Sequence, residues 1–138
     1  MSIEDVLEFV KKHDLMMLAT VDDNGKPEAA VVEFGEKDDF TIVIDTLTTS
    51  RKYKNLQSCN NVAVVVGWDN SVTVQFEGSA TELLGPALEA AKQAYFAKNP
   101  RAKKWADRPD VAYFAIKPNW IRYSDLNQDP WLIEEFSL

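Results

Sequence analysis

The sequence has 138 residues and carries 15 Lys and Arg against 22 Asp and Glu, a formal charge of −7. This length suits one domain over residues 1–138, large enough to fold without a metal or disulfide framework. A single cysteine, Cys59, excludes an intramolecular disulfide and a thiolate zinc cage. No apolar run approaches the ~20 residues of a membrane span, and no secretory leader is visible. We therefore expect a soluble, cytoplasmic, single-domain protein that does not associate with membranes.

The positive charge is concentrated in two stretches without acidic residues. Residues 46–68 contain Arg51, Lys52 and Lys54, and residues 90–106 contain Lys92, Lys98, Arg101, Lys103 and Lys104. The rest of the chain then has 7 basic and 22 acidic side chains, a charge of −15. Such a background repels a polyanion, so we expect no nucleic-acid partner, while one basic stretch can still attract a small anion.

The first half of the chain predicts one helix and three strands. Ser2 is typical of a helix N-cap, and the apolar positions that follow continue to Lys11 and Lys12, whose charges suit a helix C-terminus. Short apolar runs bounded by turn formers then predict antiparallel strands. The strands are Leu15–Val21, Glu28–Phe34 and Phe40–Ile44, and the turns between them are Asp22–Pro27 and Gly35–Asp39.

The second half predicts two further helices and three further strands. Hydroxyl residues that can cap a helix precede Arg51–Ser58, and Pro86 suits the first turn of a helix over Ala87–Ala97. Gly78 marks a bulge or sharp bend within a long strand. The strands are Val62–Trp68, Val72–Leu84 and Val111–Lys117, the last extended by Ile121–Tyr123 after the loop Lys98–Asp110.

Six mostly short, hairpin-linked strands with helices between them predict a mainly β protein, a six-stranded antiparallel β-barrel with α-helices. Val62–Val66 and Val111–Ile116 are apolar on both faces, which fits strands covered inside by a core and outside by helices or a partner chain. A parallel α/β sheet is disfavoured, because only one connection is long enough for a helical crossover.

The chain supplies few catalytic groups of its own. His13 is the only histidine, which excludes a metal site with two histidine ligands, and its place beside Asp14 favours a cap or surface role. Cys59 has no histidine nearby and is expected to be a packed residue. No Gly-rich dinucleotide fingerprint or P-loop motif occurs. We expect no metal site, and any enzymatic chemistry would come from a cofactor.

The most informative stretch is Thr46–Lys52. Its hydroxyl groups and backbone N–H groups precede a helix, where unpaired donors and the helix dipole favour an anion. Arg51 adds a planar fork of donors and Lys52 a mobile charge, a combination suited to a terminal phosphate. The alternative interpretation is a well-capped surface helix with solvated basic side chains.

In the order of its motifs, the sequence resembles the pyridoxamine 5′-phosphate oxidase-like, FMN-binding split-barrel superfamily, including its small general-stress-protein-like members. Four pieces carry the resemblance: Leu18–Asp22 with Gly25–Pro27, Ile44–Thr46, Ser50–Leu56 and Val74–Gly78. The resemblance implies a homodimer of split barrels with two FMN sites at the subunit interface.

The resemblance also implies which residues bind the cofactor, although it assigns no catalytic residue. Ser50, Arg51 and Lys52 would hold the FMN phosphate. Asp45, Thr46 and the backbone of Ala29–Val32 would flank the isoalloxazine ring, and Gln75 would approach the flavin. The alternative for Gln75 is a solvent-facing strand residue.

Several positions depart from the true oxidases of this superfamily. The second strand, Glu28–Val32, lacks their Arg and Lys, Ser124 stands where they have Trp, and Asn127–Pro130 replaces their substrate-binding Arg and His. We therefore do not expect oxidation of pyridoxamine phosphate. We expect an FMN-dependent oxidoreductase with an unknown small substrate. The alternative is a non-catalytic module that binds or senses a flavin, the deazaflavin F420 or haem.

The second basic stretch, Lys98–Lys104, has two interpretations. Its side chains either follow a helix C-terminus into a solvated loop, or form a positive rim that steers an anionic ligand. Three tryptophans, Trp105, Trp120 and Trp131, fall in predicted loops or in the tail. They are expected to be buried in a dimer interface, over a flavin, or within the monomer.

Overall fold

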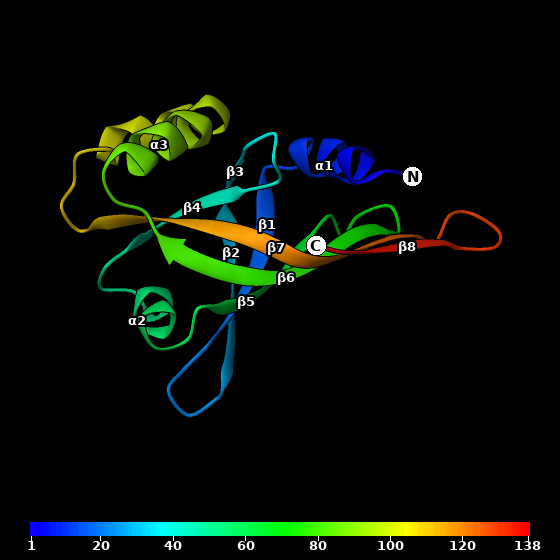
Figure 1. The fold of residues 1–138 in the computed structure, drawn as a ribbon, viewed down its shortest axis with the longest axis horizontal. Helices are drawn as coiled ribbons and strands as arrows, with labels where there is room; N and C mark the ends of the chain where they lie inside the picture. Colours follow the sequence, from blue (N-terminus) through cyan, green and yellow to red (C-terminus); the bar gives the residue numbers. More distant parts are fainter.

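The computed structural model describes residues 1–138 and contains one antiparallel sheet with helices at its edges and faces (Figure 1). The strands are Leu15–Val21 (β1), Pro27–Glu33 (β2), Gly35–Glu36 (β3), Ile42–Leu47 (β4), Asn61–Val66 (β5), Val72–Glu82 (β6), Val111–Asp125 (β7) and Leu132–Ser137 (β8). The helices are Ile3–Lys11 (α1), Arg51–Ser58 (α2) and Pro86–Lys98 (α3), and Pro100–Trp105 forms a 3-10 helix (η1). None of the α-helices combines the length and apolar character that crossing a membrane requires.

The sheet has the strand order β2-β1-β5-β6-β7-β4-β3, and β8 pairs with β7 outside this path. All pairs are antiparallel. Strands β2 and β4 contact each other although they lie far apart in this order, because the sheet curls into a half-barrel (Figure 1). The predicted mainly β, antiparallel architecture with a few helices is confirmed.

The predicted number of six strands is wrong, because the sheet has eight. Strand β3 is only two residues long and lies where the polar composition predicted a turn. Strand β8 lies in a segment that predicted no strand, because Leu132, Ile133 and Phe136 do not alternate strictly with polar residues. Its strand conformation depends on pairing with β7, which runs unbroken to Asp125.

The main core fills the inner face of the half-barrel with 20 buried apolar residues. Strand alternation turns Met16 and Leu18 of β1 inward, and it turns Val74 and Phe76 of β6 into the same core. Helix α1 adds an apolar stripe to this core, and its start is fixed by the predicted cap, since the Ser2 hydroxyl accepts a hydrogen bond from the backbone of Asp5.

A second, smaller cluster lies where α3 and η1 cover the outer face of β4 and β7. Val43 and Tyr113 come from the strands, Ala91 and Tyr95 from α3, and Ala102 from η1. This cover explains why β7 is apolar on both faces. The inner face of β5 lies in the main core, and no helix of the chain covers its outer face, where cover by a partner chain stays a prediction.

Gly78 lies at the predicted irregularity of β6. Glu77 pairs with Trp120 and Gly78 with Pro118, so the register shifts here and Asn119 of β7 is the extra residue of a β-bulge. A Cβ at Gly78 would collide with the carbonyl oxygen of Lys117 on β7. Glycine is therefore required here by the close approach of two backbones. The predicted bulge or sharp bend does fall at Gly78, but the extra residue lies on β7 and not on β6.

Phe40 was expected to begin the third strand, but it lies in the turn before β4. Its φ of 67° is in the left-handed region, which a bulky residue rarely adopts. The side chain is buried in the main core, where its ring packs edge-on against Phe76 at 6.0 Å between centroids. Burial of the aromatic ring therefore offsets the backbone strain.

Candidate functional site

The start of α2 forms a polar site beside the end of β4. Ser50 is the N-cap residue, and its Oγ accepts a hydrogen bond from the Tyr53 backbone N–H at 3.1 Å. Thr46, buried at the end of β4, places its Oγ1 2.8 Å from the same oxygen. The backbone N–H groups of Arg51 and Lys52 donate to no acceptor within the chain. The structure therefore brings Thr46, Ser50, Arg51 and Lys52 together at a helix N-terminus with two free donors.

A hollow of about 160 Å³ lies in front of this N-terminus. We call it the α2 hollow. It combines side chains from the helix start with the strand that was predicted to flank a cofactor. Its lining residues are Thr20 of β1, Glu28, Ala29 and Ala30 of β2, and Ser50, Arg51 and Lys52.

Next to the α2 hollow lies a polar network that the sequence did not predict. The buried Asn55 donates from Nδ2 to Glu28 Oε1 at 2.8 Å and to Thr20 Oγ1 at 3.0 Å. The other carboxylate oxygen of Glu28 lies 3.1 Å from the Arg51 guanidinium. Arg51 and Asn55 are four residues apart and share one face of α2, which is the signal that could have linked them.

Asp45 precedes Thr46 but faces the other way, because successive side chains of a strand point to opposite faces. Its carboxylate accepts hydrogen bonds from the Tyr95 hydroxyl at 2.9 Å and from Trp105 Nε1 at 2.8 Å. Burial, together with the nearby Asp45 charge, raises the pKa of Tyr95 well above its usual range. Asp45 thus joins β4 to α3 and η1, and its side chain does not lie with Thr46 and Ser50.

Gln75 lies on the outer face of β6 and is exposed. In the register of the sheet it stands between Val65 of β5 and Arg122 of β7. It is not among the residues that line the α2 hollow. Within one chain, therefore, Gln75 is separated from the predicted phosphate-binding residues.

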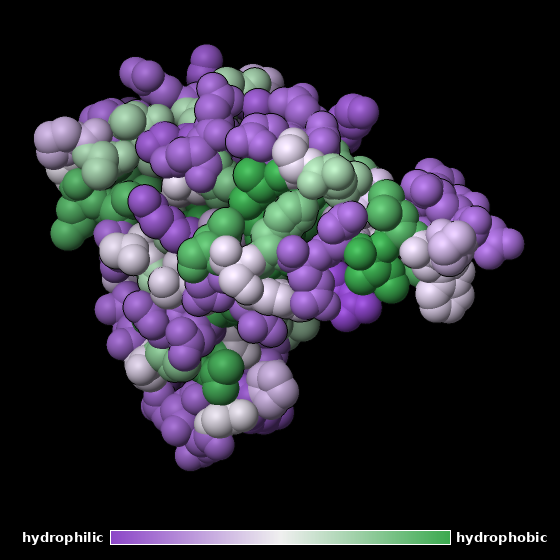
Figure 2. Space-filling view, turned by 45° about the vertical axis from the view of Figure 1, so that its right-hand side comes forward, coloured by the Kyte–Doolittle hydropathy of each residue, from purple (hydrophilic) through white to green (hydrophobic).

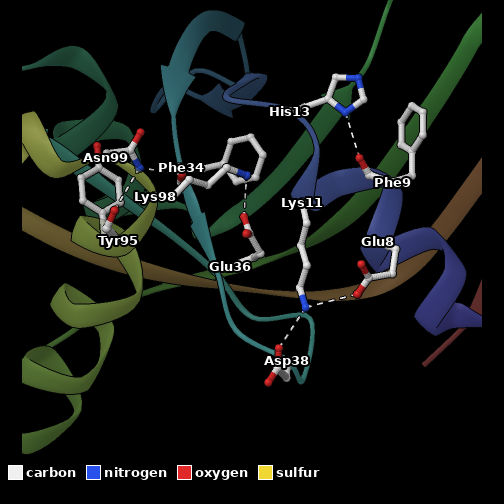
Figure 3. Close-up of polar contacts among 10 residues, drawn as sticks. All are labelled: Glu8, Phe9, Lys11, His13, Phe34, Glu36, Asp38, Tyr95, Lys98 and Asn99. Carbon is white, nitrogen blue, oxygen red and sulfur yellow. Dashed lines mark hydrogen bonds and ion pairs between the residues drawn. The ribbon is translucent and has the colours of Figure 1, made fainter.

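Two side chains of the second basic stretch contact β2, β3 and the residue between them. Lys98 Nζ lies 2.7 Å from a Glu36 carboxylate oxygen and 3.8 Å from the centroid of the Phe34 ring (Figure 3). Arg101 lies 3.5 Å from Glu33. These contacts fasten the end of α3 and the start of η1 to the sheet, so at Lys98 and Arg101 the stretch has a structural role.

The three tryptophans have different environments. Trp105 is fixed by its hydrogen bond to Asp45, and Trp120 lies within β7 and is half-buried. Trp131 is exposed in the segment between β7 and β8. In Figure 2 this segment projects from the right-hand side of the molecule, with hydrophilic residues at its tip and hydrophobic residues where it joins the body.

His13 acts as a local cap, as its position predicted. Its Nδ1 lies 2.9 Å from the Phe9 carbonyl oxygen, to which a protonated Nδ1 donates (Figure 3). Cys59 is the C-cap residue of α2 and is a free, half-buried thiol. No group of three or more His, Cys, Asp and Glu side chains is arranged to hold a metal ion.

Comparison with known proteins identifies both the family and the fold. A sequence model described as pyridoxamine 5′-phosphate oxidase matches residues 2–125. General Stress Protein 26 from Bacillus anthracis str. Sterne is 22% identical with a TM-score of 0.77, and the match covers 100% of both chains. A Clostridium acetobutylicum protein related to general stress protein 26, of the pyridoxinephosphate oxidase family, is 16% identical with a TM-score of 0.75, covering 97% of this chain and 92% of the other.

A third similar structure is larger. A heme binding protein from Mycobacterium smegmatis is 19% identical with a TM-score of 0.80 over 94% of this chain. The match covers 55% of that protein, so the present chain spans little more than half of its length. A search of curated protein sequences found no match. At these identities the similar structures establish the fold alone.

Proposed function

Because the chain belongs to the pyridoxamine 5′-phosphate oxidase-like split-barrel family, we propose that it is an FMN-binding flavoprotein that acts as an oxidoreductase on a small substrate. The observation that carries this proposal is the placement of Ser50, Arg51 and Lys52 around the α2 hollow, with Thr46 in contact with the Ser50 hydroxyl. The sequence predicted Ser50, Arg51 and Lys52 for the cofactor's phosphate, and Thr46 as one of the residues that flank its ring.

The residues of the α2 hollow suit a phosphate group. The free N–H groups of Arg51 and Lys52 and the positive end of the helix dipole favour an anion. The Arg51 guanidinium and the Lys52 ammonium add charge, and the Ser50 hydroxyl can donate a hydrogen bond. When FMN is bound, it would supply hydride transfer, and the protein would supply binding, orientation and the exclusion of water.

The proposed cofactor site needs a second copy of the chain to include Gln75. The face of the sheet that bears Gln75 also carries exposed apolar side chains two and three strands away, namely Leu15 and Met17 on β1 and Val31 on β2. An exposed apolar patch of this kind marks an interaction surface. We propose that two chains form a homodimer through this face, so that Gln75 of one chain approaches the cofactor of the other. Light scattering should show a dimer, and Val31→Lys should convert it to monomer.

FMN binding is tested by titrating the purified protein with FMN and following the quenching of flavin fluorescence. A double variant, Arg51→Ala with Lys52→Ala, should weaken binding by several kcal/mol, because each charged hydrogen bond contributes about 1.5–3 kcal/mol. A matched control is Lys103→Ala with Lys104→Ala, which removes two adjacent basic residues that form no ion pair. No quenching at micromolar FMN would refute the proposed cofactor.

A second candidate function is a non-catalytic module that binds or senses a flavin, F420 or haem. The scarcity of acid–base residues favours it, and a structurally similar protein is described as heme binding. The absorption spectrum of freshly purified protein separates the three ligands. If FMN is bound but neither NAD(P)H nor any tested acceptor changes its redox state, the module is supported over the enzyme.

We also propose that residues 1–138 form one domain. Strands β4 and β7 contribute to both apolar clusters, with Ile44 and Phe114 in the main core and Val43 and Tyr113 in the smaller one. Unfolding in urea should therefore be a single transition, whether followed by tryptophan fluorescence or by circular dichroism. The cytoplasmic location stays a prediction of the sequence that cell fractionation would test.

A further inference from the structure

The ion pair between Arg51 and Glu28 divides two hollows on the surface. One is the α2 hollow, of about 160 Å³, and the other measures about 220 Å³. Both residues line both hollows. The second hollow contains Asp22 and Asp23, whereas in the first the only carboxylate is that of Glu28. A phosphate therefore favours the α2 hollow, where Glu28 is the one opposing charge.

The two members of this ion pair differ in their freedom to move. The Glu28 side chain is 13% exposed and is also held by Asn55, whereas the Arg51 side chain is 74% exposed. If the pair separates, the Glu28 carboxylate keeps its hydrogen bond from Asn55. Arg51 can therefore turn towards a ligand, while Glu28 stays in the wall of the hollow.

Glu28 lowers the positive charge that the α2 hollow offers to a ligand. Arg51 and Lys52 contribute two positive charges and Glu28 one negative charge, which leaves a net charge of +1. A phosphate monoester carries close to two negative charges at neutral pH. A fixed carboxylate in the wall repels such a dianion and also competes with it for the Arg51 guanidinium.

We propose that Glu28 sets the affinity of the α2 hollow for a phosphate monoester by competing with the ligand for Arg51. The charge of the hollow, and hence its preference between neutral and dianionic ligands, then depends on this one side chain. This inference rests on the proposed function, since it concerns the same site and the same phosphate-bearing ligand.

The closing experiment compares the wild type with Glu28→Gln, using FMN and riboflavin as probes. Riboflavin has the same ring system without the phosphate, so it reports every effect other than the phosphate charge. Glu28→Gln should bind FMN at least tenfold more tightly, which corresponds to about 1.4 kcal/mol, while the affinity for riboflavin stays unchanged. Glu33→Gln on the same strand is the matched control, because it removes a carboxylate that pairs with Arg101 outside the hollow.

Glu28→Gln keeps an oxygen that can accept the Asn55 hydrogen bond. Two further variants, Glu28→Ala and Arg51→Ala combined with Glu28→Gln, strengthen this comparison. Glu28→Ala removes the carboxylate side chain, and Asn55 can still donate to Thr20. Glu28→Ala therefore replaces Glu28→Gln in the experiment if Glu28→Gln does not fold. Arg51→Ala should weaken FMN binding by a larger factor in the Glu28→Gln background than in the wild type, because Arg51 is then free of its competitor.

The outcomes separate the inference from the proposed function. If the wild type binds FMN and the Glu28 variants bind it no more tightly, the inference is overturned and the proposed function stands. An equal gain for riboflavin also overturns it, because the effect would not depend on the phosphate. If neither wild type nor variants bind FMN, both the proposed function and the inference fail.

Discussion

The two basic stretches of the chain look alike in sequence but differ in their surroundings. In the second stretch, Lys98 is fixed between Glu36 and the Phe34 ring, and both charged side chains are only 11% exposed. In the first stretch, Arg51 is largely exposed and Lys52 forms no ion pair within the chain. One stretch therefore holds the structure together, whereas the other keeps charge and hydrogen-bond donors available.

The difference arises from a single acidic segment that faces both stretches. Glu28, Glu33 and Glu36 lie along β2 and β3 and pair with Arg51, Arg101 and Lys98, respectively. Only the pair of Glu28 lies at a helix N-terminus with free donors. The function of a basic stretch thus depends on the partners that the fold places opposite it.

The largest expected effect concerns stability and tests this contrast directly. Glu36→Ala leaves Lys98 as an unpaired, nearly buried charge, which should lower the free energy of unfolding by about 3 kcal/mol. Arg51→Ala leaves the Glu28 carboxylate without its ion pair, but Asn55 still donates a hydrogen bond to it and the removed side chain is mostly exposed, so the cost should be smaller, about 1 kcal/mol. Urea denaturation of the two variants measures both values.

A double variant, Lys98→Met with Glu36→Leu, provides the control for this first prediction. Replacing both charges by apolar groups of similar volume removes the unpaired charge, so much of the lost stability should return. If Arg51→Ala proved as destabilising as Glu36→Ala, the contrast between a structural and an available stretch would be wrong.

The next prediction concerns Asp45, which joins β4 to the elements around the second stretch. Asp45→Ala leaves the Tyr95 hydroxyl and Trp105 Nε1 without their acceptor. Unfolding should then require about 2 kcal/mol less, because partly buried donors lose their hydrogen bonds. Asp45→Asn, which retains one acceptor oxygen, should cost less. Equal stability of Asp45→Ala and wild type in urea would contradict this role.

Much of the candidate site follows from local sequence, because its residues are close in the chain. A hydroxyl N-cap followed by Arg51 and Lys52 predicts the anion-binding end of a helix, and the structure shows this helix start with Thr46 beside Ser50. Asp45 could have been separated from Thr46 by strand alternation alone. The alternation of β6 likewise indicated that Gln75 faces outward, as the structure shows.

The features that escaped prediction depend on contacts between distant residues. Glu28 and Asn55 meet only after β2 and α2 pack together, and their separation of 27 positions leaves no local signal. Strand β8 similarly depends on its pairing with β7. Local propensities cannot report such contacts, because their stabilising partners lie elsewhere in the chain.

A smaller effect separates capping from ligand binding. Ser50→Ala removes the N-cap of α2 and should lower the free energy of unfolding by about 1 kcal/mol. It also removes a hydroxyl from the α2 hollow, so FMN binding should weaken. Ser2→Ala is the matched control, because Ser2 caps α1 in the same way but lies away from the hollow. Equal loss of FMN affinity in both variants would refute the role of Ser50 in the site.

The smallest effect at neutral pH is expected at Tyr113, in the cluster beneath the second basic stretch. Its hydroxyl is buried without a hydrogen-bond partner, so Tyr113→Phe should change stability at pH 7 by less than about 1 kcal/mol.

Burial, together with Asp45 and Asp107, raises the pKa of Tyr113 to about 12. In the unfolded chain the pKa is about 10. The unfolded state therefore loses this proton first, and the contribution to stability, complete below pH 10, is lost as the pH rises towards 12. Tyr113→Phe removes this contribution, so urea denaturation of the variant should show a shallower alkaline loss of stability than the wild type. Parallel pH profiles for the two proteins would show that the Tyr113 hydroxyl is not buried as the structure places it.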